Sequence, residues 1–384
     1  MRASLLDRFR HGAPFVVAIL GVVVGSIWAV APAIGASRPW DTTTTTTTVP
    51  SSTSTTTTTV PIPTTTTTTP MRSNIPWPVQ GSAAVAIPQL SVAASSPRQP
   101  RVPIASLTKL MTTWVVLHRL PLKVNQRGPC LTVNAHDVAL WKYDDESGQS
   151  NAEVALGEKL CEGTLLRGLI VHSAGNYAYL LARLVGLGQQ EFVTVMNRDA
   201  RALGLSHTHY TDLSGISPGD LSTAHDQAIM AIDLMNGEPV VRAIAALAYV
   251  MLPVAGVVGS YTPDVGQFGV IGLKSGYTGV AGGCDIMAIN VTINHTVITT
   301  YAVVLGQFSS NPLGLAGQAA LTLSRTLRAG MRVVATRTGR AIAWTGWPGA
   351  LTPVTTTTTT IPATTTTTTI PATTTTSVTT SSVI

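Results

Sequence analysis

Apolar residues recur at helical spacing in several stretches between positions 107 and 331 of the 384-residue chain. Residues three and four positions apart share one face of a helix, so each stretch predicts an amphipathic helix. The second stretch is long enough for two helices, with Gly175 in the interruption between them. The stretches are 107–120, 161–186, 191–204, 221–237 and 314–331.

The pattern changes after position 267. Runs rich in β-branched and apolar residues occupy 268–278, 282–293 and 295–307, and Gly and Asn residues separate them. Such runs joined by short turns predict adjacent antiparallel strands. A block of helices followed by a block of strands indicates an α+β fold, in which helices cover an antiparallel sheet beside a helical lobe.

The two ends of the chain differ from this central part. Threonine runs interrupted by Val and Pro fill much of 42–69 and 355–376. Such segments bury too little apolar surface to offset the entropy of ordering, so we expect disordered linkers, with or without attached sugars. The predicted organisation is an N-terminal anchor or signal, a Thr/Pro-rich linker, one compact domain and a Thr-rich tail, at 1–36, 37–75, 76–346 and 347–384.

The N-terminal segment predicts export. Arg2, Arg8 and Arg10 precede an apolar stretch that runs from Ala13 to Ala36. This stretch exceeds the core of a signal peptide and suits a membrane span of about 20 residues, with the basic flank in the cytoplasm. Small residues at its end would also permit cleavage. Either way the domain is expected outside the cytoplasm, at the outer face of the membrane or secreted.

Charge and cysteine content exclude several classes of function. The formal net charge is +6 without a basic run, so we expect no nucleic-acid partner. Three cysteines lack the spacing of a metal site, and the pair His207 and His209 has no third ligand in view. The sequence therefore predicts neither a metal nor a cofactor.

A serine and a lysine stand three residues apart at the start of the helix predicted for 107–120. Ser106 and Lys109 would share one face of that helix, and the chain has only five lysines. A hydroxyl beside an amine that is sunk into a core is one way to make a serine nucleophilic. The alternative is that Ser106 caps the helix and Lys109 points into water.

Two further groups of polar residues suit this chemistry. Lys274-Ser275-Gly276 follows apolar strand residues, where a lysine and a hydroxyl can bind a carboxylate and a glycine lets a substrate backbone come close. The segment from Ser173 to Asn176 lies in the break between two predicted helices. Each group by itself is also typical of a turn or a helix end.

In this order, Ser-x-x-Lys, Ser/Asn and Lys-Ser-Gly resemble the motif set of the serine penicillin-recognising enzymes. The chain is similar to the low-molecular-weight D-alanyl-D-alanine carboxypeptidases, which are penicillin-binding proteins of peptidase family S11. The similar stretches are "ASLTKLMT", "MNRDARALGLSHTHYTDLSGIS", "STAHD" and "GLKSGYTGVAGGCDIMA". The resemblance covers about 76–308 and implies a β-lactamase/transpeptidase-like fold.

The resemblance implies a role for each matching residue. Ser106 is expected to be the acylated nucleophile, and Lys109 the base that takes its proton. Burial and the charge of Lys274 would lower the pKa of Lys109, as a base requires. Substrate binding falls to Lys274, Ser275, Gly276 and Tyr277, with the backbone N–H groups of Ser106 and Tyr277 as the oxyanion hole.

The second motif departs from the family pattern Ser-x-Asn, because Ser173-Ala174-Gly175-Asn176 is one residue longer. Alignment on Asn176 puts Ala174 at the serine position, and alignment on Ser173 displaces the asparagine. The flanking residues favour the first register, with Asn176 holding the substrate amide. Ser173 would then reach the site through a local bulge at Gly175 and pass a proton.

The function that the resemblance implies is removal of the terminal D-alanine from peptidoglycan stem peptides, with β-lactams as inhibitors. One alternative is a catalytically silent scaffold in the cell wall. A β-lactamase is a weaker alternative, because Glu191 does not fit the deacylating Glu-x-x-Leu-Asn motif. The sequence does not separate carboxypeptidase from endopeptidase or transpeptidase activity. In relatives the segments that hold Cys130 and Cys161 run close together, which implies a disulfide in an exported protein.

Overall fold

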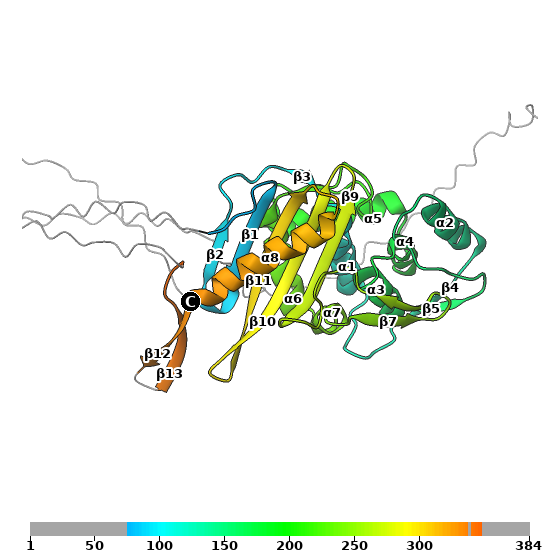
Figure 1. The fold of residues 1–384 in the computed structure, drawn as a ribbon. Coiled ribbons are helices and arrows are strands. Elements are labelled where there is room, and N and C mark those ends of the chain that lie inside the picture. The colour runs from blue at the N-terminus through cyan, green and yellow to red at the C-terminus, as the bar shows by residue number, and fades with distance from the viewer. Residues whose placement is uncertain (1–74, 337–338, 348–384) are drawn as a thin grey trace, which may run out of the picture. The chain divides into compact units, whose positions relative to one another are not determined.

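A five-stranded antiparallel sheet forms the centre of the computed structural model, which describes residues 75–336 and 339–347 (Figure 1). The strands lie in the order β2-β1-β11-β10-β9. Their bounds are β1 Ser82–Ile87, β2 Val92–Ser95, β9 Val270–Thr278, β10 Gly282–Ile293 and β11 Thr296–Gln307. The three C-terminal strands are those predicted from the sequence. The first two extend the sheet on the far side of β11.

Both faces of the sheet are buried, which explains why its strands read as nearly continuous apolar runs. Alternate residues of β10 point to opposite faces. Cys284 and Ile286 join the core between the sheet and the helical part, whereas Met287 and Ile289 join the core beneath the C-terminal helix. The β10–β11 hairpin closes through two residues with positive φ, as a tight two-residue turn requires.

Helices cover the sheet on both sides (Figure 1). Helix α8 crosses one face and packs on β10 and β11, and α6 packs on the opposite face against β1 and β11. The remaining helices gather into a lobe beside β9. The bounds are α1 Thr108–Arg119, α2 Ala135–Glu146, α3 Glu162–Ile170, α4 Gly175–Leu184, α5 Gln189–Ala202, α6 Ala224–Gly237, α7 Pro239–Ala245 and α8 Pro312–Ala329.

Short elements complete the described part. Four two-stranded ribbons pair β3 with β6, β4 with β5, β7 with β8, and β12 with β13. Two 3-10 turns precede β2 and α1. The bounds are η1 Pro88–Leu90, η2 Ala105–Leu107, β3 Val102–Pro103, β4 Cys130–Thr132, β5 Lys159–Cys161, β6 Leu221–Ser222, β7 Tyr249–Leu252, β8 Gly256–Gly259, β12 Met331–Thr336 and β13 Gly339–Trp344.

Local sequence signals place several helix starts. The Thr223 side chain accepts a hydrogen bond from the Asp226 N–H and so caps α6. Asn134 and Asp137 form a reciprocal capping box at the start of α2, a helix that the sequence analysis did not predict. These caps satisfy backbone donors that the first turn of a helix leaves unpaired.

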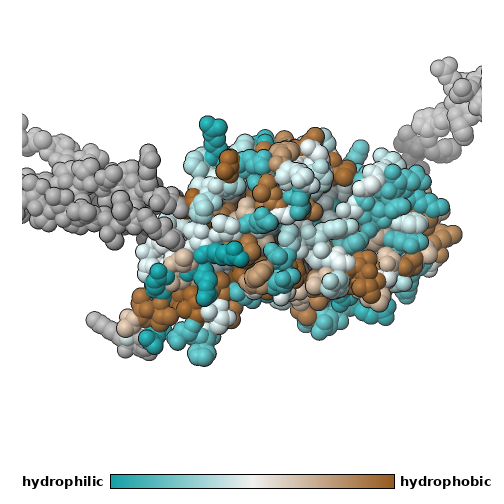
Figure 2. Space-filling model, viewed as in Figure 1, coloured by the Kyte–Doolittle hydropathy of each residue, from teal (hydrophilic) through white to brown (hydrophobic). Residues whose placement is uncertain are grey.

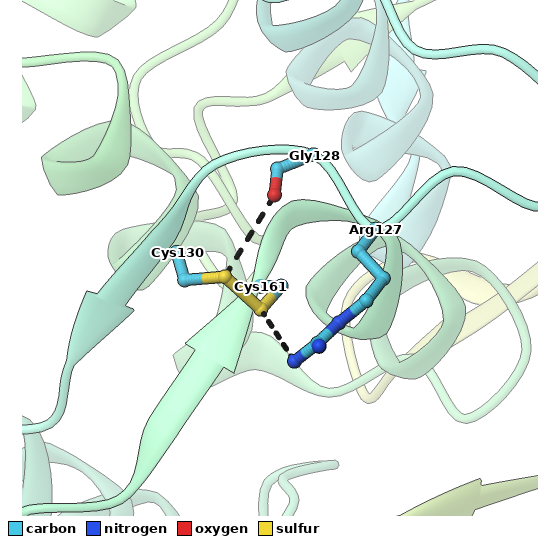
Figure 3. Close-up of a disulfide and its surroundings, with 4 residues drawn as sticks. All are labelled: Arg127, Gly128, Cys130 and Cys161. Carbon is cyan, nitrogen blue, oxygen red and sulfur yellow. Dashed lines mark hydrogen bonds between the residues drawn. A yellow bond between two sulfur atoms is a disulfide. The ribbon is translucent and has the colours of Figure 1, made fainter.

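Cys130 and Cys161 form a disulfide, so that prediction is confirmed. The two residues are direct partners across the β4–β5 ribbon. Figure 3 shows the Arg127 side chain reaching the Cys161 sulfur, at 3.5 Å, with the Gly128 carbonyl near the other sulfur. The bridge ties the approach to α2 to the start of α3.

The β12–β13 ribbon forms an apolar cover at the end of the sheet opposite the helical lobe. Side chains of the β12–β13 ribbon, among them Ile342 and Trp344, pack against the core beneath α8. Figure 2 shows a cluster of hydrophobic residues toward that end, whereas hydrophobic and hydrophilic residues are mixed over the rest of the visible face. No helix within the described ranges is both long and apolar enough to cross a membrane. The predicted N-terminal anchor and both Thr-rich segments lie outside the described residues.

Candidate active site

The candidate nucleophile lies where η2 passes into α1. Ala105 takes a left-handed conformation with φ of 49°, a strained geometry of the kind that gathers at active sites. The Lys109 Nζ donates to the Ser106 Oγ at 2.9 Å. Ser106 makes no side-chain cap for α1, and Lys109 is only 3% exposed, so the alternative of a capping serine and a solvated lysine is wrong.

Lys109 sits in a buried polar setting that favours its neutral form. Burial lowers the pKa of Lys109 from 10.5 to about 8, although the charges of Asp212, Asp144 and Asp220 raise it. The ammonium also donates to the Ser214 carbonyl. An amine with this pKa is partly neutral near physiological pH and can accept a proton from a neighbouring hydroxyl.

The loop that presents the Ser214 carbonyl was missed by sequence reasoning. Asp212 accepts hydrogen bonds from the backbone N–H groups of Ser214, Gly215 and Ser217. The loop also packs closely on the nucleophile turn, since a Cβ at Gly215 would lie 1.9 Å from the Ala105 carbonyl oxygen. An aspartate followed by Ser and Gly is a turn signal that could have indicated this loop.

The third motif lies on the edge strand β9, directly against the nucleophile. A Cβ at Gly276 would lie 2.6 Å from the Ser106 backbone nitrogen, so only glycine lets the strand come this close. The next residue, Tyr277, is the second predicted oxyanion donor. An edge strand offers unpaired backbone groups to which an extended peptide can bind. The geometry thus brings Ser106, Lys109 and Gly276 together.

Lys274 and Ser275 lie beneath this edge. Both side chains are buried, and the Lys274 Nζ donates to the Ser275 carbonyl at 2.8 Å. Burial and the charge of Lys109 lower the pKa of Lys274, and the nearby Asp285 opposes this shift. The Ser275 hydroxyl donates to the Tyr261 carbonyl. Two lysines therefore share one buried site, which favours a charge on only one of them at a time.

Ser173 occupies the break between α3 and α4. It has a φ of 59° and is buried, and its Oγ has no hydrogen-bond partner among the described residues. The preceding residues contact the third motif through Tyr261, whose N–H donates to the Val171 carbonyl and whose ring stacks on His172. A strained serine with an unpartnered hydroxyl beside these motifs is consistent with the proton-passing role predicted for it.

Asn176 disagrees with its predicted role. Its side chain is fully buried, and both ends of the amide bond the backbone of Ala152, at 2.8 and 3.0 Å. Such an amide fixes the loop around Ala152 and argues against a role in holding a substrate amide. The neighbouring Gly175, which begins α4, faces the Ser214 loop instead. The favoured alignment on Asn176 therefore does not match the structure.

The described residues contain no group of three His, Cys, Asp or Glu side chains that could hold a metal ion. His207 and His209 lie on a turn away from the three motifs. The backbone N–H of His207 donates to the Asp226 carboxylate, and that of His209 donates to the Leu221 carbonyl. Their backbone bonds fix a turn between α5 and α6.

Comparison with known proteins defines the class. A sequence model of the D-alanyl-D-alanine carboxypeptidase family, Peptidase S11, matches residues 79–309, which is more than half of the chain. The protein therefore belongs to this family. The α+β fold predicted from the sequence is confirmed.

The individual sequence relatives match a shorter part of the chain than the family model does, at identities of about one third. The carboxypeptidase DacD of Escherichia coli is 34% identical over 149 residues, which are 38% of this chain and 37% of DacD. A D-alanyl-D-alanine endopeptidase of Haemophilus influenzae is 30% identical over 141 residues, which are 36% of this chain and 44% of that protein. The structure of penicillin binding protein 6B from Escherichia coli has a TM-score of 0.58 and 25% identity, and the match covers 71% of this chain and 89% of that one.

Proposed function

We propose that the protein is a serine-type D-Ala-D-Ala carboxypeptidase that removes the terminal D-alanine from peptidoglycan stem peptides. The observation that carries the proposal is the buried Lys109 amine, 2.9 Å from the hydroxyl of Ser106, whose backbone lies directly against Gly276 of β9. Family membership and the order of the three motifs support it.

The proposed reaction has two halves. In the first, the Ser106 Oγ attacks the carbonyl carbon of the penultimate D-alanine, and its proton moves to the Lys109 Nζ. The carbonyl oxygen gains negative charge and accepts hydrogen bonds from the N–H groups of Ser106 and Tyr277. Lys109 then gives the proton to the leaving D-alanine amine. In the second half, water cleaves the acyl ester and restores Ser106.

The third motif is proposed to hold the carboxylate end of the substrate. Lys274 supplies positive charge, Ser275 a hydroxyl, and Gly276 the space for a substrate backbone. Since the Ser275 hydroxyl is engaged by the Tyr261 carbonyl, it must rotate to reach a ligand. Asn176 is assigned a structural role, and Ser173 the proton-passing role.

Acylation by a β-lactam tests this proposal. The full-length protein is incubated with a penicillin, the adduct is measured on intact protein and its position is found by peptide mapping. A D-Ala-D-Ala peptide is assayed in parallel for released D-alanine, with Ser106→Ala as the inactive control. An adduct on Ser106 together with D-alanine release supports the proposal.

The other outcomes separate the alternatives. An adduct on Ser106 without release of D-alanine from any D-Ala-D-Ala peptide indicates a catalytically weak or silent cell-wall module. Cleavage only of cross-linked peptides indicates an endopeptidase, and rapid loss of the adduct with hydrolysed penicillin indicates a β-lactamase. An adduct on another residue, or none with several penicillins, overturns the assignment of Ser106.

We also propose that the apolar segment Ala13–Ala36 holds the domain at the outer face of the cell membrane. The support is its length and its basic flank, together with the disulfide, which suits an oxidising compartment. Cell fractionation tests it, with the protein expected in the membrane fraction. Recovery of the bulk from the culture medium with a new N-terminus after Ala36 would show cleavage instead.

A further inference from the structure

Gly175 of the second motif lies close to the loop that binds the catalytic lysine. A Cβ placed at Gly175 would lie 3.1 Å from the Ser150 carbonyl oxygen and 3.8 Å from the Ser214 Cβ, so the space around it is tightly filled. The Ser214 carbonyl in turn accepts a hydrogen bond from Lys109. Gly175 is therefore one residue removed from Lys109, since both of them contact Ser214.

A carboxylate from another element packs against the same position. Asp144, near the end of α2, brings its Oδ2 to 3.5 Å from where the Gly175 Cβ would lie. The side chain is buried, and this oxygen has no hydrogen-bond partner among the described residues. Burial raises the pKa of Asp144 to about 6, and the charge of Lys109 acts to lower it.

An unpartnered buried oxygen costs stability, so its presence in a native fold calls for an explanation such as a functional role. The charges of two other carboxylates also raise the pKa of Lys109, but both of these carboxylates already accept hydrogen bonds. Asp212 accepts three backbone N–H groups, and Asp220 accepts from the Thr211 backbone and the Thr108 hydroxyl. Asp144 is the acid near Lys109 whose Oδ2 stays unbonded within the described residues.

We propose that Asp144 is a positioning residue whose carboxylate stabilises the ammonium that Lys109 becomes when it takes the proton of Ser106. The inference rests on the proposed function, since it concerns the same acylation step. The proton moves from the Ser106 Oγ to the Lys109 Nζ while the Oγ bonds to the substrate carbonyl carbon. Asp144 neither gains nor loses a proton in this step. The arrangement parallels the acid of a Ser-His-Asp triad, which stabilises the charged base.

The sign of the effect follows from the groups around Lys109. Asp144 faces it from α2, Asp212 and Asp220 from the loop before α6, and Lys274 from β9. The negative charge of Asp144 raises the pKa of Lys109. Removal of that charge therefore makes Lys109 a weaker base that becomes neutral at lower pH.

The test is the pH profile of acylation for Asp144→Asn, which has nearly the same size without the charge. The rising limb of the acylation rate is expected to move to lower pH by about one unit. The plateau rate at high pH should fall by about three- to tenfold, because the base is weaker. Asp144→Ser provides a second neutral variant should the asparagine prevent folding.

The matched control is Asp137→Asn on the same helix. Asp137 is equally buried and pairs with Arg183, but it does not act on Lys109. The control should lose stability while its rising limb stays in place. A limb that is unmoved in the neutral Asp144 variants, or equally moved in the control, overturns the inference.

The interaction between the two charges can also be measured at Asp144, because each charge shifts the pKa of the other group. The charge of Lys109 lowers the pKa of Asp144, so Lys109→Met should raise the pH at which this carboxyl titrates. Carbon-13 NMR of labelled aspartates follows that titration without substrate. Failure of wild-type acylation would refute the proposed function alone, whereas an unchanged carboxyl titration refutes the role of Asp144.

Discussion

Replacement of Gly276 by alanine should disable the site with little effect on the fold. The new Cβ would lie 2.6 Å from the Ser106 nitrogen, where ordinary contact needs 3.4 Å, so strand and nucleophile must separate by about 0.8 Å. The nitrogen and Cα of Ser106, 2.6 and 3.2 Å away, are backbone atoms, which cannot rotate away as the end of a flexible side chain can. A displacement near 1 Å at a reacting group costs about 100-fold in rate, and loss of one oxyanion donor costs about 10²–10³-fold.

The assay is the rate of acylation of full-length Gly276→Ala by a penicillin, measured from the adduct with time. We expect a fall of about 100-fold or more, with a melting temperature within a few degrees of wild type. Gly279→Ala is the matched control, because a Cβ there meets nothing within 4 Å. If Gly276→Ala acylates at the wild-type rate, the edge of β9 does not set the geometry of the nucleophile, and the oxyanion-hole assignment fails.

Three further predictions follow from the same geometry. The acylation rate should rise with pH through the pKa of Lys109, about 8, because only the neutral amine accepts the proton; a profile that is flat from pH 6 to 9 would contradict this. Ser173→Ala should slow acylation by about 10²–10⁴-fold, whereas Asn176→Ala should lower the free energy of unfolding by about 1–3 kcal/mol and leave the rate nearly unchanged; equal rates in both variants would remove Ser173 from the mechanism. Alkylation in denaturant should reveal one thiol before reduction and three after it, and three thiols without reductant would exclude the Cys130–Cys161 bridge.

The sequence predicted the elements whose pattern is local and strong. The long strands β10 and β11 are nearly continuous apolar runs, and helix α6 carries its cap at Thr223. The missed elements have weak patterns. Strand β1, "SAAVAI", consists mostly of small residues, and α2 exposes most of its surface, so its apolar positions have little periodicity. Tertiary packing on the sheet and the lobe places both.

The candidate site also contains one part that the local sequence predicts and another part that only the tertiary structure brings together. Ser106 and Lys109 are three positions apart, so a helix alone puts them in contact, and the sequence suffices. The group that surrounds the lysine comes from distant parts of the chain. Asp144 precedes Gly175 by a whole helix, and the Ser214 carbonyl belongs to a loop between α5 and α6. A backbone carbonyl carries no sequence signal, and a lone aspartate in an exposed helix is usually solvated.

Asn176 shows where a motif and its geometry separate. An asparagine next to the expected position invites an alignment that keeps its chemistry, and the flanking residues favour that alignment. The structure shows otherwise: α4 begins at Gly175, and Asn176, which points about 100° away from Gly175 around the helix, faces the Ala152 loop. The asparagine turns to Ala152, where a buried amide with two backbone bonds is well satisfied. The absence of a side chain at Gly175 lets the unpartnered Oδ2 of Asp144 pack against this position, 3.5 Å from where a Cβ would lie. In the role proposed for Asp144, the lengthened motif and the buried acid thus belong to one arrangement of the site.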